Sequence, residues 1–267
     1  MLIDAHAHLT VNDPAYPSHR EVTDPMTAER LLAALDEHGL AAAVAVQRAH
    51  VFGFDNSYVV DSAARHPDRL AAMCVVDAQA PDAETTVRRW AGRGAVAMRL
   101  TAPGGNQHGG PGGTDWFAGP SARRVWRSAA ELGLSMCLHI YRWNRDDCLR
   151  ALPDVVREFP GTPVVLDHIA SVEPDRPEAL LALTDLAEVH VKVTTLNYAR
   201  LPDAPADVVT WLVSRFGAGR VLWGSDVTQT PVGYPDMVRL GRESVAGLKP
   251  EDAALVLGGA AARLYGL

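Results

Sequence analysis

The 267 residues include 25 basic and 32 acidic side chains, which gives a net charge of −7, and 48% of the residues are hydrophobic. This balance argues against a nucleic-acid-binding surface. The chain contains neither a run of about 18 apolar residues that could span a membrane nor the cationic start of a signal peptide. We therefore expect a soluble cytoplasmic protein with a small-molecule substrate, no nucleic-acid partner and no membrane contact; whether it forms a homo-oligomer stays open.

Short apolar stretches alternate with segments of helical spacing along the whole chain. The eight predicted strands are 2–6, 41–46, 71–76, 94–100, 134–140, 163–168, 189–194 and 220–225. The clearest helices between them are predicted at 24–39, 120–133, 144–158, 203–216 and 250–264. Nearly continuous apolar strands, each followed by a helix, favour a single-domain (β/α)8 barrel over residues 1–267. A doubly wound open sheet is the alternative.

Local signals refine these elements. Asp24 is the expected N-cap of the first helix, with Pro25 at its first position and Gly39 just past its end. Pro153 is expected to kink or restart its helix. The glycines and prolines of 101–117 predict a loop without regular structure after the fourth strand. The wider segment 101–119 is then either a lid or a surface insertion.

Two histidines, His6 and His8, flank one alanine on the first strand. Side chains alternate between the faces of a strand, so both imidazoles should point one way while Ala5 and Ala7 point the other. Two converging nitrogens suit a metal ion or a polarised substrate oxygen. The alternative is a pair of hydrogen-bonded histidines at a strand end.

Polar residues end several other predicted strands. In chain order they are Arg99, His139, His168 and Asp226. The C-terminal ends of barrel strands meet at one mouth, which is where barrel enzymes carry their chemistry. Arg99 could hold a substrate carboxylate with its bidentate fork or form a structural ion pair. Tyr141 and Arg142 follow His139 and are further candidates for substrate binding, or else exposed loop residues.

Other polar residues carry weaker signals. Gln47, His50 and His108 are minor site candidates. Lys192 shares one face of the seventh strand with His190 and Thr194, and a structural ion pair is its better interpretation. Structural roles are expected for His38 and His66. The three scattered cysteines, Cys74, Cys137 and Cys148, indicate reduced thiols and neither a disulfide framework nor a zinc ribbon.

The motifs DAHAHL, CLHI, VVLDHIA, VHVKVT and RVLWGSDV, in this order, resemble the amidohydrolase superfamily over nearly the whole chain. They are most similar to its amidohydrolase-2 branch, which contains hydrolases of sugar lactones and of 2-pyrone-4,6-dicarboxylate, as well as decarboxylases. The resemblance implies metal-ligand positions at His6, His8, His139 and Asp226, and contact of His168 with the reacting water or carbonyl. One divalent ion, zinc first, is implied; because some lactonases of this branch work without metal, a metal-free mechanism stays open.

The departures from the family pattern are informative. Arg99 stands where binuclear members have a lysine or a glutamate, which argues against two metal ions. Asp4 stands where decarboxylases have a glutamate, and Val227 and Thr228 replace a Trp-Pro pair. We expect a hydrolase that opens a small carboxylated or polyhydroxylated lactone, with Asp226 activating water and His6, His8 and His168 holding the carbonyl oxygen. The alternatives are a metal-dependent decarboxylase of an aromatic or enoic acid, and a barrel that binds a ligand or metal without turnover.

Overall fold

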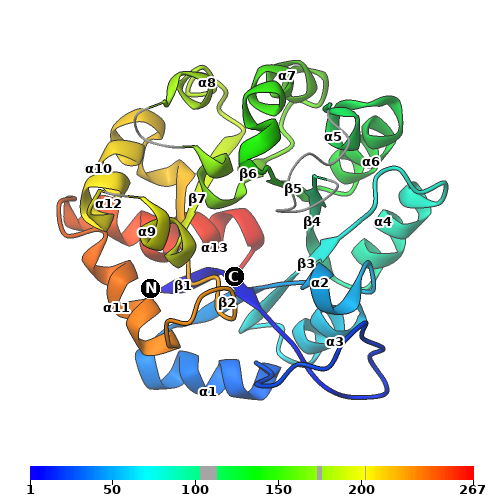
Figure 1. Cartoon of the computed structure of the whole chain (residues 1–267), viewed down its shortest axis with the longest axis horizontal. Helices are drawn as coiled ribbons and strands as arrows, with labels where there is room; N and C mark the ends of the chain where they lie inside the picture. Colours follow the sequence, from blue (N-terminus) through cyan, green and yellow to red (C-terminus); the bar gives the residue numbers. More distant parts are fainter. Residues whose placement is uncertain (103–112, 173–175, 202) are drawn as a thin grey trace.

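The computed structural model describes residues 1–102, 113–172, 176–201 and 203–267. Eight parallel strands form one sheet in sequence order, with a bridge between Ala7 and Val227 linking its last segment back to its first (Figure 1). The strands are β1 (Ile3–His8), β2 (Ala42–Val46), β3 (Leu70–Val75), β4 (Ala95–Thr101), β5 (Ser135–His139), β6 (Val164–Leu166), β7 (Val189–Thr194) and β8 (Val221–Gly224). The predicted (β/α)8 barrel is confirmed, and every predicted strand is present.

Helices surround the barrel on all sides (Figure 1). They are α1 (Ala28–His38), α2 (Ala49–Phe52), α3 (Ser57–Arg65), α4 (Ala83–Gly92), α5 (Asp115–Ala118), α6 (Pro120–Glu131), α7 (Arg145–Glu158), α8 (Glu178–Leu181), α9 (Thr195–Arg200), α10 (Pro205–Phe216), α11 (Tyr234–Glu243), α12 (Pro250–Ala254) and α13 (Ala260–Tyr265). Within the described ranges, none of these helices has the length and apolar character needed to cross a membrane.

The start of α1 differs from the prediction. Thr27, and not Asp24, is the N-cap, because its side chain accepts a hydrogen bond from the Arg30 amide. The amide and carbonyl of the preceding Met26 are both hydrogen-bonded to Thr10, which keeps them out of a helix beginning at Pro25. The predicted end is confirmed, since Gly39 caps the helix with a φ of 69°.

Two other helices also depart from expectation. The expected restart at Pro153 is absent, because α7 runs through this residue as one helix with buried Leu149 and Val155 on either side of it; the expected kink stays a prediction. The helix predicted at 250–264 is divided by a π-helical turn at Leu255–Gly259. A Cβ atom on Gly258 would lie 2.6 Å from the Met1 carbonyl oxygen, so this turn presses directly against the start of β1.

The glycine-rich segment after β4 is only partly a loop. Residues 115–118 form α5, which contradicts the prediction of no regular structure over 101–117. Burial of Trp116 and Phe117 stabilises this turn, and the Trp126 indole donates a 2.7 Å hydrogen bond to the Phe117 carbonyl. Residues 103–112, with His108 and the question of a lid, lie outside the described part of the chain.

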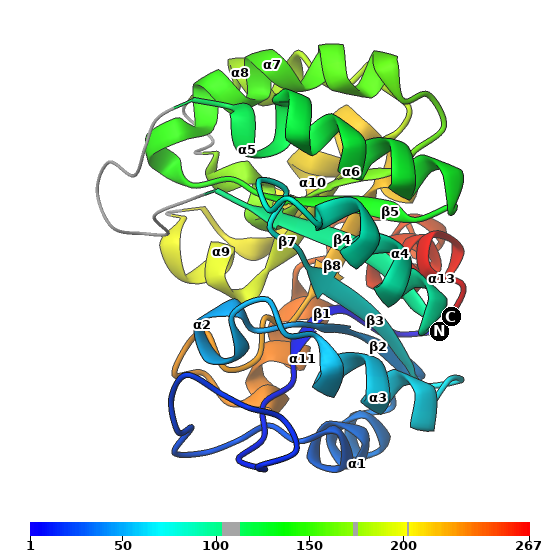
Figure 2. The same cartoon turned by 90° about the vertical axis from the view of Figure 1, so that its right-hand side faces the viewer.

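The barrel encloses one core and the helices cover another. Inside the barrel, alanines and larger apolar residues of the strands pack together with Ala260, Ala261 and Tyr265 of α13. Larger side chains fill the outer layer between strands and helices. Figure 2 shows α13 and both termini at one end of the barrel, with α2 and α9 at the other. The N-terminal end is therefore packed, and the polar side chains gather at the C-terminal end.

Candidate active site

A β-bulge in β1 aims the first two histidines. Between Asp4 and Ala7, β1 contains one residue more than the facing part of β2. Ala5 consequently packs into the inner core beside His6, and only Ala7 faces the outer layer. The expectation that Ala5 points away from the histidines is therefore wrong. The two imidazoles nevertheless converge as predicted, because the Nε2 atoms of His6 and His8 lie 3.3 Å apart.

The end of β8 brings Asp226 to these imidazoles. A Cβ atom on Gly224 would lie 2.6 Å from the His6 Cβ, so glycine is what permits this close approach of β8 to β1. Beyond it, Asp226 adopts a φ of 57° and its amide donates a 2.8 Å hydrogen bond to the His6 carbonyl. The Asp226 Oδ1 atom then lies 3.5 Å from His6 Nε2 and 3.4 Å from His8 Nε2.

His168 is carried by an unusual left-handed turn. Four consecutive non-glycine residues, His168 to Ser171, have φ angles of 50–56°. Each costs roughly 1–2 kcal/mol in this conformation, and such strain is typical of functional sites. Hydrogen bonds hold the turn: Asn197 donates to the His168 carbonyl at 3.0 Å, and the Ser171 hydroxyl to the Ile140 carbonyl at 2.8 Å.

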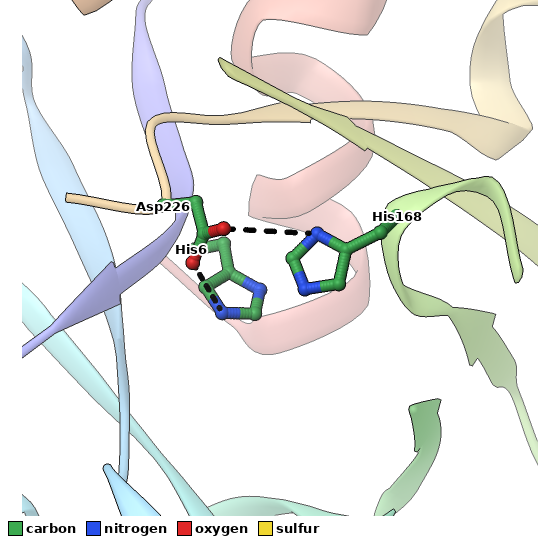
Figure 3. A group of neighbouring side chains, drawn as sticks. All are labelled: His6, His168 and Asp226. Carbon is green, nitrogen blue, oxygen red and sulfur yellow. Dashed lines mark ion pairs between the residues drawn. The ribbon is translucent and has the colours of Figure 1, made fainter. Parts of the chain in front are cut away.

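The turn directs His168 towards Asp226, as Figure 3 shows. The His168 Nδ1 atom lies 2.9 Å from the Thr194 hydroxyl and 3.9 Å from Asp226 Oδ2. Ligand atoms of His6, His168 and Asp226 all lie within 4.8 Å of one another. Side chains from β1, β6 and β8 therefore converge on one point.

The protonation pattern favours a bound cation at this point. His8 Nδ1 lies 2.9 Å from the Val46 carbonyl, which can only accept, so the proton of the neutral ring is on Nδ1 and Nε2 presents a lone pair to Asp226. Neither oxygen of the buried Asp226 carboxylate has a hydrogen-bond partner among the described residues. A buried charge without partners is costly, so these converging lone pairs fit one divalent ion.

Burial controls the charges of these groups. It lowers the pKa of His6 to about 3, although the nearby Asp167 carboxylate opposes the shift. Burial also lowers the pKa values of His8 and His168. For Asp226, burial alone would raise the pKa, but the positive charge that His168 and the neighbouring imidazoles acquire in acid outweighs it and lowers the pKa to about 2. At neutral pH the site therefore holds neutral imidazoles around an ionised carboxylate.

Asp167, which sequence reasoning missed, organises the floor of the site. Lys192 Nζ donates to its Oδ1 at 2.9 Å and Arg99 Nε to its Oδ2 at 2.6 Å, while His6 Nδ1 lies 3.3 Å away. Asp167 and Lys192 are both 0% exposed. The ion pair expected for Lys192 is therefore present, and Arg99 takes part in the same network. The available signal was an aspartate directly before His168 at the end of an apolar strand.

A cavity of about 280 Å³ opens above these groups. Its wall includes His139, Arg99 and Tyr141, and also Arg48 and Arg200, two arginines that sequence reasoning did not select. Arg48 is held by a 3.0 Å hydrogen bond to the Thr228 carbonyl. A position two residues after the second strand was the signal for Arg48. Arg200 lies at the end of a short helix that only the fold places at the mouth.

The other candidates occupy distinct positions. His139 lies beside this cluster, with its ring 5.2 Å from that of His168 and its buried Nδ1 without a partner in the described ranges, so its role as a metal ligand stays a prediction. Arg142 lines an adjoining cavity. His50 reaches the mouth, whereas Gln47 donates to the Gly53 and Asp55 carbonyls and holds the loop.

The two histidines expected to be structural, and His190, have local explanations. His190 Nδ1 contacts the Glu188 carbonyl at 2.9 Å, and His38 ends α1. His66 is the C-cap of α3. All three cysteines are buried and unpaired, in line with the absence of a predicted disulfide framework: Cys74, Cys137 and Cys148.

Asp4 does not contribute to the cavity. Its Oδ1 accepts hydrogen bonds from the Ser225 amide at 2.8 Å and the His6 amide at 3.0 Å, and its Oδ2 accepts from the Tyr234 hydroxyl at 3.1 Å. Burial raises its pKa to about 6 even though these bonds oppose the shift. Asp4 therefore ties β1 to β8 and α11 and leaves no oxygen directed at the imidazoles.

A parallel barrel with histidines and an aspartate at its C-terminal mouth is the arrangement of a barrel enzyme, either a hydrolase or a related class. The family model described as Amidohydrolase matches residues 3–267, and the chain belongs to this family. No curated protein matches the chain at a significant level.

Solved structures share the fold at low sequence identity. A probable 2-pyrone-4,6-dicarboxylic acid hydrolase from Acinetobacter baumannii, with citric acid bound, is 21% identical with a TM-score of 0.79, covering 100% of this chain and 99% of that one. A putative 2-pyrone-4,6-dicarboxylic acid hydrolase from Pseudomonas putida is 22% identical with a TM-score of 0.78, covering 99% and 97%. A 2,6-dihydroxybenzoate decarboxylase from Rhizobium is 14% identical with a TM-score of 0.68, covering 99% and 98%.

Proposed function

We propose that this protein hydrolyses a small carboxylated lactone, with Asp226 as the general base for water. The observation that carries the proposal is the buried Asp226 carboxylate, which has no hydrogen-bond partner in the described structure and faces a cavity lined by Arg48, Arg99 and Arg200. Arginines bind carboxylates through paired N–H groups. They favour a carboxylated lactone over a neutral polyhydroxylated one.

The geometry supports a direct hydrolytic sequence. Asp226 takes a proton from a water molecule, and the resulting hydroxide attacks the ester carbonyl of the lactone. The imidazoles of His6, His8 and His168 border the position of the ester carbonyl. The Nε2 lone pair of His8 cannot donate to an oxyanion and would instead serve as a ligand of the cation proposed below. Arg99, with Tyr141 beside it, binds a substrate acid group. Opening of the ring gives a hydroxy acid after the proton returns to the leaving alkoxide.

We also propose that one divalent ion, zinc first, binds His6, His168 and Asp226, with His8 and His139 as the neighbouring ligand candidates. Such an ion would supply Lewis-acid polarisation of the substrate carbonyl. Protein purified without chelator should contain about one divalent ion per chain by elemental analysis. Asp226→Asn should lower that content because it removes the anionic ligand. Full turnover by a metal-free sample would contradict a catalytic role for the ion.

Decarboxylation of an aromatic or enoic acid is the second candidate function. It has the support of the 2,6-dihydroxybenzoate decarboxylase among the structural neighbours. The position of Asp4 argues against it, because both oxygens of the acidic residue before the paired histidines are bonded away from the cavity. Hydrolysis therefore ranks first.

Incubation with a panel of pyrone carboxylates, sugar-acid lactones and hydroxybenzoates tests the assignment. Proton release without CO₂ is the result expected for a lactonase. Release of CO₂ would establish the decarboxylase instead, and saturable binding without either product would indicate a non-catalytic barrel.

Arg99→Ala should raise KM for a carboxylated lactone by roughly 10- to 100-fold, because a hydrogen bond to a charged group contributes about 1.5–3 kcal/mol. The remaining Lys192 keeps Asp167 paired, so the barrel should fold. Steady-state kinetics with the carboxylated lactone and its uncharged methyl ester provide the check. An equal rise in KM for both substrates would show that Arg99 acts through the fold and does not bind the acid group.

A further inference from the structure

A second cavity of about 850 Å³ adjoins the first. The two share Tyr141, His168, Ser171, Leu196 and Arg200, so they form one continuous space across the mouth of the barrel. The proposed hydrolysis uses only the first cavity, which carries the imidazoles and Asp226. The larger volume is therefore available to a part of the ligand that does not react.

The second cavity differs in chemistry from the first. Apart from the shared residues, its walls are mainly apolar and include Trp143, Val172 and Leu201. Two exposed arginines, Arg142 and Arg200, also line it. None of its described lining residues is acidic. Such a surface suits an apolar group with the size of an aromatic ring, attached to an anionic core.

Two capped turns build these walls. After β5, the Tyr141 amide donates to the Asn144 side chain at 3.2 Å and fixes the turn that carries Trp143. After β7, the Thr194 amide donates to the Asn197 side chain at 2.9 Å and fixes the start of α9, which carries Leu196. The wall is therefore formed before any ligand binds, which reduces the entropy that binding must overcome.

We propose that this cavity binds an aryl or branched alkyl substituent of the substrate, so that the enzyme acts on an apolar-substituted carboxylated lactone and not on a compact dicarboxylate. The substituent is attached next to the reacting ester, because Tyr141 and His168 lie at the border of the two cavities. The lactone part of this inference rests on the proposed function. The binding part does not require turnover.

Calorimetric binding of succinate and phenylsuccinate tests the subsite without catalysis. The wild-type protein should bind phenylsuccinate roughly 10- to 100-fold more tightly, as expected for burial of a phenyl group. Trp143→Ala and, separately, Leu196→Ala should reduce this ratio several-fold. Leu132→Ala is the matched control, because Leu132 is 40% exposed at the C-terminal end of α6 and lines neither cavity. Its ratio should equal that of the wild type.

The outcomes separate the two proposals. If the wild-type protein binds the two acids equally well, the subsite is overturned. The same holds if neither acid binds measurably. The lactone panel tests the proposed hydrolase activity independently. A high ratio that both Trp143→Ala and Leu196→Ala preserve also overturns it, because the phenyl group would then bind elsewhere. Circular dichroism of each variant shows whether it is folded, and two independent variants keep the test decisive if one is not.

Discussion

Replacing Asp226 by asparagine is expected to lower kcat by about 10²- to 10⁴-fold, the usual contribution of a positioned general base. The amide is nearly isosteric and its N–H group can donate to the His8 Nε2 lone pair, so the fold should be preserved. The low pKa of Asp226, about 2, keeps it in the basic form at neutral pH but also makes it a weak base. Its position between the imidazoles must therefore carry much of the effect.

Single-turnover kinetics together with the thermal midpoint measure this expectation. Asp4→Asn is the matched control, because Asp4 is equally buried but bonds only to Ser225, His6 and Tyr234. It should affect stability more than turnover, whereas Asp226→Asn should do the reverse. Wild-type turnover by Asp226→Asn would exclude Asp226 as the base.

The sequence was sufficient to predict the barrel and much of the mouth. Apolar runs separated by capped helices leave few alternatives to a parallel barrel, and this fold gathers strand ends at one place. His6, His8, His168 and Asp226 could thus be brought together before any geometry was known. These residues end or directly follow their strands, so small errors in strand boundaries did not change the result.

The remaining site residues depend on features that periodicity does not encode. Asp167 faces the site because β6 stops at Leu166 and a left-handed turn follows. None of the four consecutive left-handed residues is a glycine, so the local sequence gives no signal for this turn. Arg200 reaches the cavity only through the path of α9. The bulge in β1, which turns Ala5 inward, is likewise set by the pairing register between β1 and β2 and not by the backbone preferences of the residues in β1.

Asp167→Asn is expected to be the most destabilising single change at the site. It would leave Arg99 and Lys192 without the carboxylate that both contact, at 5% and 0% exposure. Removal of one partner from a buried ion pair costs about 3–5 kcal/mol, because the remaining charge stays desolvated. For a chain of this size that corresponds to a thermal midpoint lowered by roughly 6–20 °C.

The double variant Asp167→Asn/Lys192→Met separates charge imbalance from lost packing. Methionine retains the apolar stem of lysine and removes one of the two unpaired cations, so the double variant should melt at a higher temperature than Asp167→Asn alone. Lys192→Met by itself leaves Asp167 paired with Arg99 and should be the milder single variant. A double variant less stable than Asp167→Asn would show that the Lys192 ammonium stabilises the fold through contacts other than Asp167.

The pH dependence gives an independent check of the same network. Lys192 and Arg99 hold the pKa of Asp167 well below the ordinary carboxyl value, against the opposing effect of burial. A lowered carboxyl pKa contributes stability that is fully present above the unfolded-state pKa of about 4 and is lost as the pH falls through the folded-state value. The stability difference between wild type and Asp167→Asn should therefore be constant from about pH 5 to 9 and should shrink in stronger acid. A difference that instead grew on acidification would mean that Asp167 is protonated in the folded protein, and the proposed pairing with two cations would be wrong.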